Sequence, residues 1–343
     1  MYNLDQVRVL EIETTNTCNA SCPQCLRTNE DTLAPTLFDD DLDWELALSN
    51  IPTNFWRQLE RINFNGSTGD NISHRDIQSI VAKVIELAPQ AHIRVCTNGS
   101  LRTTKWWKIL GSITKDSNVE VIFGIDGLED THKLYRVGTN WGKIIENARA
   151  FVSAGGRATW QMILFEHNLH QVDACRQLAK DYGFSEFYLR SENRFFGGKT
   201  EQAVFWKGQQ THTIQYPDQS KLPNILKEEE VVNTWSQALQ PLGNTKSISC
   251  RSIETKWLAI YADGTVWPCC WLMGWHRASH LTQFNLINYH FKKILNIDFN
   301  QISLYHNNLK DIVNSDLWQQ RYPESFSRAP NPVCIQQCSN CSN

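Results

Sequence analysis

The chain has 343 residues, enough for more than one domain, and 41% hydrophobic and 20% charged residues are typical of a globular protein. Its 33 basic and 36 acidic residues leave a formal net charge of −3, which disfavours a nucleic-acid or anionic-membrane partner. There is no apolar run long enough to span a bilayer and no secretory signal, so we expect a cytoplasmic protein with no membrane partner.

The 11 cysteines are unevenly placed along the chain. Three lie within the segment Cys18–Cys25, five follow residue 268, and Cys96, Cys175 and Cys250 stand alone. Because the cytosol keeps thiols reduced, this usage favours metal ligation over a disulfide framework. The isolated Cys96 and Cys175 are expected to be small core residues, with a catalytic thiol as the alternative for Cys96.

Patterns typical of strands and helices alternate about six times in the first 195 residues. The first helical pattern is broken at Pro52, and the second is capped by Ser73 with Asp76 in the capping-box position. The predicted strands are Val7–Ile12, Arg61–Phe64, His92–Cys96, Val119–Ile125, Thr159–Phe165 and Glu186–Arg190. The predicted helices cover Asp41–Leu59, Ser73 to Pro89, the Trp106-Trp107 segment, Gly142–Val152 and Leu169–Tyr182.

This alternation implies parallel strands joined by right-handed crossovers. Six units are too few for a closed eight-stranded barrel, so we predict an α/β fold in which residues 1–195 form a partial (β/α)6 TIM-like barrel. Polar and glycine residues follow the carboxyl end of each predicted strand. In an α/β barrel this rim is where the chemistry is assembled.

The second half of the chain has a different pattern. Residues 196–247 lose the periodicity and are predicted to be a connecting segment with a helix near Val232–Leu239. Residues 248–343 are expected to form a small cysteine-rich α+β domain. Weak helices are predicted there at Phe291–Leu295 and Ile312–Trp318.

The clearest element of this second predicted domain is a β-hairpin. Trp257–Tyr261 and Thr265–Pro268 flank an Asp263-Gly264 pair, which is suited to the positive φ angles of a type I′ turn. Cys269 and Cys270 follow directly. The hairpin therefore carries two thiols at its end.

The three cysteines after the first predicted strand indicate a metal centre with an open position. Cys18, Cys22 and Cys25 lie within eight residues, close enough to hold one soft metal centre. A closed zinc site or a fully ligated four-iron cluster needs a fourth ligand, so one coordination position remains for another group.

The spacing Cys18-x3-Cys22-x2-Cys25, followed by a glycine-rich second strand end and a Thr97-Asn98-Gly99 third strand end, resembles the radical S-adenosylmethionine (radical SAM) enzymes. The resemblance implies that the three thiolates hold a 4Fe-4S cluster and that S-adenosylmethionine chelates the fourth iron. Reduction by a donor such as flavodoxin or ferredoxin would then give a 5′-deoxyadenosyl radical. The alternative is a zinc site completed by a distant His or Cys.

The same resemblance implies a cofactor pocket at the strand ends. The segment from Asn65 to Asp70 is similar to the glycine-rich stretch that binds the amino group of the cofactor. Glycines allow close backbone approach, and Asp70 would accept from the ammonium directly or through water. Arg190 would reach the cofactor carboxylate or the substrate, or form a solvated rim ion pair. The residues implied in cofactor binding are Gly66, Ser67, Gly69, Asp70, Thr97, Asn98, Asp126, Asn168 and Arg190.

The carboxyl-terminal cysteines resemble the twitch and SPASM extensions of this family, which hold auxiliary iron-sulfur clusters. The middle cysteine group of a full SPASM extension is missing, so the resemblance implies one auxiliary 4Fe-4S cluster. Structural zinc in the same thiolates is the alternative. The implied ligands are Cys250, Cys269, Cys338 and Cys341, with Cys334 and Cys270 as substitutes.

The resemblance implies an enzyme that abstracts hydrogen from an unactivated carbon of a peptide, a protein or a small polar metabolite. The auxiliary cluster would aid oxidation or bind the substrate, and Arg194 to Trp206 and Trp267 to Trp275 are candidate substrate contacts. Two alternatives remain open. One is a radical SAM enzyme acting on RNA, and the other is a non-catalytic zinc-binding recognition module, although the near-neutral charge disfavours nucleic acid as a partner.

Overall fold

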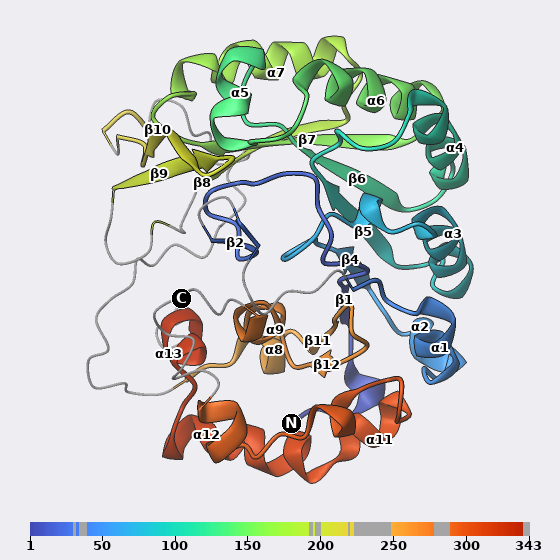
Figure 1. Ribbon diagram of the computed structural model, residues 1–343. Helices are drawn as coiled ribbons and strands as arrows, with labels where there is room; N and C mark the ends of the chain where they lie inside the picture. The colour runs from blue at the N-terminus through green and yellow to red at the C-terminus, as the bar shows by residue number, and fades with distance from the viewer. Residues whose placement is uncertain are drawn as a thin grey trace.

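The computed structural model describes residues 1–29, 32–33, 40–191, 195, 200–218, 220–222, 248–277 and 289–338. A curved eight-stranded sheet forms its centre, with helices along the outer face (Figure 1). The strand order is β12-β11-β1-β4-β5-β6-β7-β8. These strands are β1 Val9–Ile12, β4 Arg61–Phe64, β5 His92–Thr97, β6 Val119–Gly124, β7 Arg157–Leu164, β8 Glu186–Ser191, β11 Trp257–Ile260 and β12 Val266–Trp267.

Within this sheet, β1, β4, β5, β6, β7 and β8 are each parallel to the next. The helices that connect them lie on the convex side of the sheet, as Figure 1 shows for α3, α4, α6 and α7. The sheet does not close, because β8 and β12 stand at its two edges. The predicted partial barrel of six strand-helix units is therefore confirmed.

The helices follow the predicted pattern with two differences. Pro52 separates two short helices, as expected, but α3 begins at Ile77 rather than after Ser73. Ser73 belongs to a separate 3-10 turn, in which the Asp70 side chain accepts a hydrogen bond from the Ile72 amide. Helix α5 was not predicted. The helices of this half are α1 Trp44–Ser49, α2 Thr53–Trp56, α3 Ile77–Leu87, α4 Thr104–Thr114, α5 Glu129–Tyr135, α6 Trp141–Ser153 and α7 Val172–Asp181.

Alternation along the strands separates an apolar outer face from a polar inner face. On β1, Leu10 and Ile12 join the main core beneath the helices. Glu11, between them, therefore points to the barrel interior. On the outer side, Trp107 is fully buried with its ring 5.1 Å from that of Phe123. The Trp106-Trp107 pair is thus part of the barrel wall.

The hairpin of the carboxyl-terminal segment extends the barrel sheet. Strand β11 runs parallel to β1, with Leu258 opposite Leu10, and β12 pairs antiparallel with β11. The predicted hairpin is confirmed, but its turn is not type I′. Only Gly264 has positive φ, at 78°, and its amide donates to the Tyr261 carbonyl at 2.9 Å. The proposed domain boundary at residue 248 stays a prediction.

A second hairpin, which was not predicted, follows β8. Strands β9 (Glu201–Trp206) and β10 (Gln209–Gln215) pair antiparallel in the segment expected to be a connection. Val204 and Ile214 pack in a small apolar cluster that includes Cys22. The hairpin therefore covers the cysteine loop. A short pair, β2 Thr28–Asn29 and β3 Thr32–Leu33, follows that loop, and the helix predicted at Val232–Leu239 lies outside the described residues.

Short helices complete the carboxyl-terminal region, in the lower part of Figure 1. The first weak helix is confirmed as the π-helical segment His290–Ile294. The second, predicted at Ile312–Trp318, is divided by Ser315, whose hydroxyl donates to the Ile312 carbonyl at 2.7 Å. The elements are α8 Arg251–Glu254, α9 Cys270–Arg277, the 3-10 segment Phe299–Ile302, α11 Leu309–Asn314, the π-helical segment Leu317–Arg321, α12 Tyr322–Arg328 and α13 Pro332–Cys338.

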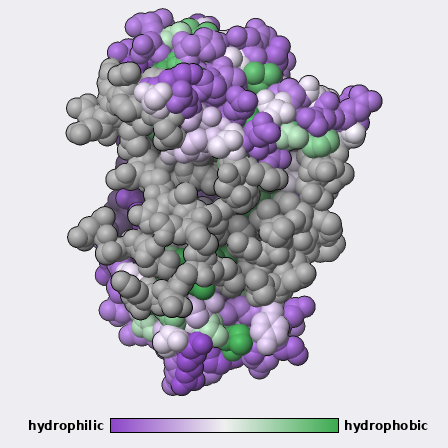
Figure 2. All heavy atoms as spheres, turned by 90° about the vertical axis from the view of Figure 1, so that its left-hand side faces the viewer, coloured by the Kyte–Doolittle hydropathy of each residue, from purple (hydrophilic) through white to green (hydrophobic). Residues whose placement is uncertain are grey.

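In the part of the chain that is described, no helix is both long enough and apolar enough to cross a bilayer. Figure 2 shows mainly hydrophilic described residues at the upper and lower ends of the face that it presents.

Candidate functional site

Cys18, Cys22 and Cys25 lie together in the loop after β1, as predicted. The Cys25 amide donates to the Cys22 carbonyl at 3.0 Å, which folds the loop back on itself. The Cys18 sulfur accepts from the Ala20 amide at 3.4 Å and from Asn98 Nδ2 at 3.6 Å. Donors of this kind stabilise thiolate ligands of iron-sulfur clusters. Burial raises the pKa of the free Cys18 thiol to about 12, and a bound cation would reverse that effect.

Hydrogen bonds of Asp70 connect the strand ends around this loop. One carboxylate oxygen accepts from the Ile72 amide at 3.0 Å. The other accepts from Thr97 Oγ1 at 3.0 Å and from the Asn98 amide at 2.8 Å. Asn98 in turn reaches Cys18, so the second and third strand ends and the cysteine loop meet at one point. Contact of Asp70 with a cofactor ammonium stays a prediction.

The glycine-rich loop packs directly against the end of β1. A Cβ atom at Gly69 would lie 2.1 Å from the Thr15 carbonyl oxygen, so a larger residue does not fit there. Gly66 has a positive φ of 71°. The Ser67 amide donates to both oxygens of Glu13 at 2.8 Å. Glu13 was not among the site residues predicted from the sequence. The available signal was an acidic residue directly after a strand with a buried face.

Asp126 and Asn168 are both fully buried and brace the rim. Asp126 accepts from Arg136 Nε and from the Ile163 amide, each at 2.6 Å. Asn168 accepts from the Phe165 amide at 2.8 Å and donates to the Ile163 carbonyl at 2.8 Å. Their predicted contact with adenosine stays a prediction.

Arg136 is a site residue that the sequence reasoning missed. Its guanidinium lies over Gly124, where a Cβ atom would be 2.6 Å from Arg136 Nη2. Burial alone would lower the pKa of Arg136. The Asp126 carboxylate and, after it, Cys22 outweigh this effect, so the pKa lies above the ordinary value of an arginine. A fixed cation therefore stands between the Asp126 rim and the cysteine loop.

The inner face of the barrel is polar. Burial raises the pKa of Glu11 to about 8 and that of Glu13 to about 7. Burial also raises the pKa of Cys96 to about 11, while Arg94 and Arg190 lower it. Arg190 therefore acts on a group inside the barrel. Its contact with the cofactor carboxylate or the substrate stays a prediction. Cys175, by contrast, is fully buried in the main core, as expected.

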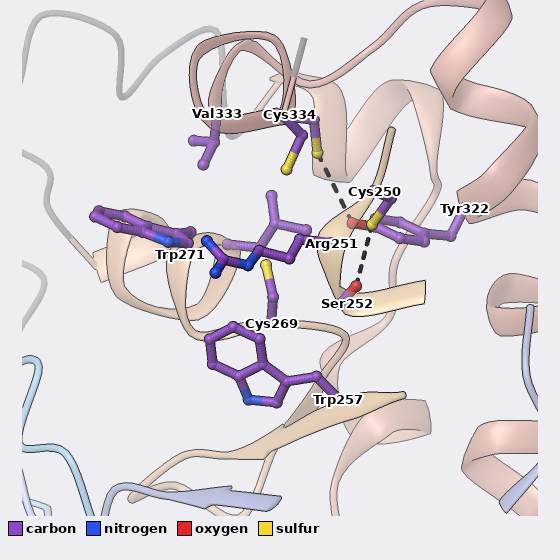
Figure 3. Close-up of a pocket in the computed structure, with 11 residues that line it drawn as sticks. Cys250, Arg251, Ser252, Trp257, Cys269, Trp271, Tyr322, Val333 and Cys334 are labelled. Atoms are coloured by element: carbon purple, nitrogen blue, oxygen red, sulfur yellow. Dashed lines mark hydrogen bonds between the residues drawn. The ribbon is translucent and has the colours of Figure 1, made fainter. Parts of the chain in front are cut away.

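Four other cysteines surround a second pocket. Cys250 precedes α8, Cys269 follows β12, and Cys334 and Cys338 lie one turn apart on α13. Cys250, Cys269 and Cys334 point toward the same space from three elements (Figure 3). Burial raises the pKa of Cys269 well above its ordinary value, and the other three thiols raise it further. The four thiols are therefore close neighbours.

This grouping differs from the predicted ligand set, which stays a prediction. Cys334, expected only as a substitute, takes a full place in the pocket with Cys250, Cys269 and Cys338. Cys341 lies outside the described residues. The Cys270 side chain instead interacts with Glu11 inside the barrel.

The thiol-lined pocket has apolar walls, to which Trp257, Trp271 and Leu272 contribute. Such walls limit the access of water to an iron-sulfur centre. Among the described residues, no group of three or more His, Cys, Asp or Glu side chains is close enough to hold a single metal ion.

Comparison with known families matches these two regions separately. Residues 12–179 match the model of the radical SAM superfamily, and residues 250–342 match that of an iron-sulfur cluster-binding domain, SPASM. The chain belongs to the radical SAM superfamily. It is therefore an enzyme, with a 4Fe-4S cluster and S-adenosylmethionine as cofactors and auxiliary iron-sulfur binding at the carboxyl-terminal end. The alternative of a non-catalytic zinc module is removed.

Several solved structures share the fold at low sequence identity. SuiB from Streptococcus suis is 14% identical, with a TM-score of 0.57 over 97% of this chain and 72% of SuiB. The protein anSMEcpe with bound AdoMet is 12% identical, with a TM-score of 0.56 over 97% of this chain and 85% of anSMEcpe. SuiB bound to its precursor peptide SuiA gives a TM-score of 0.55 at 14% identity, over 97% of this chain and 71% of SuiB. A search of curated proteins finds no match.

Substitution of Cys334 tests the revised ligand set. Cys334→Ala will lower the iron and sulfide content of the anaerobically reconstituted radical SAM protein by about one 4Fe-4S cluster, because it removes one of four thiolates around the pocket. Cys270→Ala is the matched control and will keep the full content. Full iron in Cys334→Ala, or stoichiometric zinc without labile sulfide in the unmodified protein, would contradict this assignment.

The buried Glu11 predicts a pH dependence of stability. Its pKa is raised in the folded state, so between about pH 5 and pH 8 the folded chain binds more protons than the unfolded chain. Stability from this group is present below that window and is lost as the pH rises, at about 1.4 kcal/mol per pH unit. Denaturant unfolding of the apoprotein will show that the free energy of unfolding declines less steeply with pH in Glu11→Gln than in the unmodified protein. Exposed Glu60→Gln is the control, and equal slopes for Glu11→Gln and the unmodified protein would refute the effect.

Proposed function

We propose that this radical SAM enzyme abstracts hydrogen from an unactivated carbon of a peptide substrate, with one auxiliary 4Fe-4S cluster aiding oxidation or substrate binding. The observation that carries the proposal is the contact of the three-cysteine loop, through Cys18, with the Thr97-Asn98 strand end, which Asp70 joins to the glycine-rich loop. A peptide substrate is supported by the related folds of SuiB bound to precursor peptide SuiA and anSMEcpe bound to Cp18Cys peptide.

Different residues of the chain would bind different parts of the cofactor. Cys18, Cys22 and Cys25 would hold three irons of a 4Fe-4S cluster, which together with S-adenosylmethionine supplies a 5′-deoxyadenosyl radical when an external donor such as flavodoxin or ferredoxin provides an electron. The backbone of the Gly66–Gly69 loop would bind the cofactor amine. Arg136, held over Gly124 by Asp126, would bind the cofactor carboxylate as a fixed cation.

The barrel interior lies between the two cysteine sites. Cys18 follows the carboxyl end of β1, whereas Cys250 precedes β11 and Cys269 follows the antiparallel β12. Because β11 is parallel to β1, the auxiliary pocket lies toward the amino end of these strands. Cys270, next to Cys269, reaches Glu11 in the interior. A substrate bound in the barrel would therefore lie near both sites, which favours oxidation over a simple isomerisation.

Anaerobic incubation with dithionite and S-adenosylmethionine tests the radical chemistry. The reconstituted protein will release 5′-deoxyadenosine, and Cys22→Ala will reduce the amount at least a hundredfold because a cluster ligand is lost. Cys175→Ala, in the core away from both sites, is the matched cysteine control and will retain activity. Failure of the unmodified enzyme to form 5′-deoxyadenosine, or an unchanged yield in Cys22→Ala, would sink the proposal.

A further inference from the structure

Two neighbouring side chains inside the barrel each present one buried oxygen without a hydrogen-bond partner of standard geometry. Glu11 on β1 and Asn63 on β4 are register partners in a parallel pair, so they lie side by side on the inner face. Glu11 is 1% exposed. Its Oε2 atom and the Oδ1 atom of Asn63 are both buried without a hydrogen-bond partner of standard geometry. Buried acceptors are almost always paired, so a pair of unmatched ones points to a missing donor.

The surroundings of Glu11 do not supply a positive charge. Asn65 Nδ2 donates to its Oε1 atom, and the Cys270 thiol and the Trp257 indole also interact with the carboxyl group. Glu13, which has the same sign, raises the pKa of Glu11 further. Among the described residues, Glu11 forms no ion pair.

Arg94, the cation on the next strand, contacts other groups. Arg94 is the register partner of Asn63, but its Nε donates to Glu120 at 3.3 Å. Its Nη2 atom lies 3.5 Å from the Tyr188 hydroxyl on the far side of the interior. The residues in register with Glu11 on the neighbouring strands therefore supply no positive charge beside it, in keeping with the raised pKa of its carboxyl group.

We propose that Glu11 and Asn63 bind a primary ammonium group of the substrate, presented by a lysine side chain. An ammonium carries three donors and can satisfy both oxygens at once, whereas a hydroxyl has a single donor. A guanidinium binds a carboxylate best through both oxygens, and one oxygen of Glu11 already accepts from Asn65. The inference deepens the proposed function, on which it rests, by naming the group that the peptide must carry.

The depth of the site favours a long side chain. Glu11 lies two residues before Glu13 along the chain, roughly 6–7 Å further from the rim. The four-carbon stem of lysine can carry its charge over such a distance. On the other side of Glu11 the register partner is the small Ala259 on β11.

Calorimetric titration of the cluster-loaded enzyme in excess S-adenosylmethionine tests the inference with matched probes. Nα-acetyl-lysine N-methylamide will bind at least tenfold more tightly than Nα-acetyl-norleucine N-methylamide, which lacks only the ammonium. Glu11→Gln will abolish this preference and Asn63→Leu will reduce it, whereas the exposed control Glu60→Gln will keep it. Glucosamine and N-acetylglucosamine form a second pair, which separates a free amino sugar from a lysine side chain.

Equal binding of the lysine and norleucine probes, an unchanged preference in Glu11→Gln, or tighter binding of glucosamine than of the lysine probe would overturn the proposal. Iron content and circular dichroism establish that each variant is folded, and Asn63→Leu decides the question if Glu11→Gln does not fold. Formation of 5′-deoxyadenosine without substrate is measured in parallel. If it persists while the lysine preference is absent, only this inference fails; if the unmodified enzyme forms none, the proposed function itself fails.

Discussion

A single buried carboxylate holds the cofactor site of this enzyme together. Asp70 is 3% exposed and accepts hydrogen bonds from one residue of its own turn and from two at the end of β5. Burial of a carboxylate is costly, and these three donors offset much of that cost. Through Asn98 the same network reaches Cys18, so loops that follow three different strands are fixed in one place before any cofactor binds.

The shared sheet explains how two metal-binding regions remain in fixed positions. Strand β11 pairs with β1 along its whole length, and Leu258 is fully buried against the barrel core. The carboxyl-terminal cysteines are therefore carried by an extension of the barrel sheet. The polar interior, with Glu11 and Arg94, is enclosed between the two cysteine sites. In an ordinary closed barrel the interior is filled by branched apolar side chains, so a polar interior is a departure that suits a binding site.

The sequence predicted the features that depend on local periodicity and spacing. Strand β4 was predicted with its observed bounds, because alternation is strong there, and the three-cysteine loop was recognisable from spacing alone. Cys334 was predicted only as a substitute because Cys338-x2-Cys341 has the familiar motif spacing. The helix that brings Cys334 and Cys338 one turn apart is visible only in the structure. Arg136 and Glu11 were missed because a single charged residue carries no periodic signal. Their importance appears only when the fold buries them.

Local patterns also failed where tertiary contacts decide the structure. The β9-β10 hairpin has few buried residues and a register shift between Gln210 and His212, so its alternation is weak. It is held in place by contacts far away in sequence, such as that of His212 Nε2 with the Leu134 carbonyl at 2.8 Å. The turn before α3 gave a misleading signal, because Ser73 is a good capping residue but the Asp70 side chain had already organised that turn.

The most direct measurement is electron paramagnetic resonance of the reduced Cys250→Ala/Cys269→Ala variant, which keeps only the cluster of the Cys18–Cys25 loop. If one iron of that cluster lacks a protein ligand, S-adenosylmethionine will shift the g values, and ¹⁷O in its carboxylate will produce hyperfine coupling. A spectrum unchanged by the cofactor, without ¹⁷O coupling, would contradict an open coordination site.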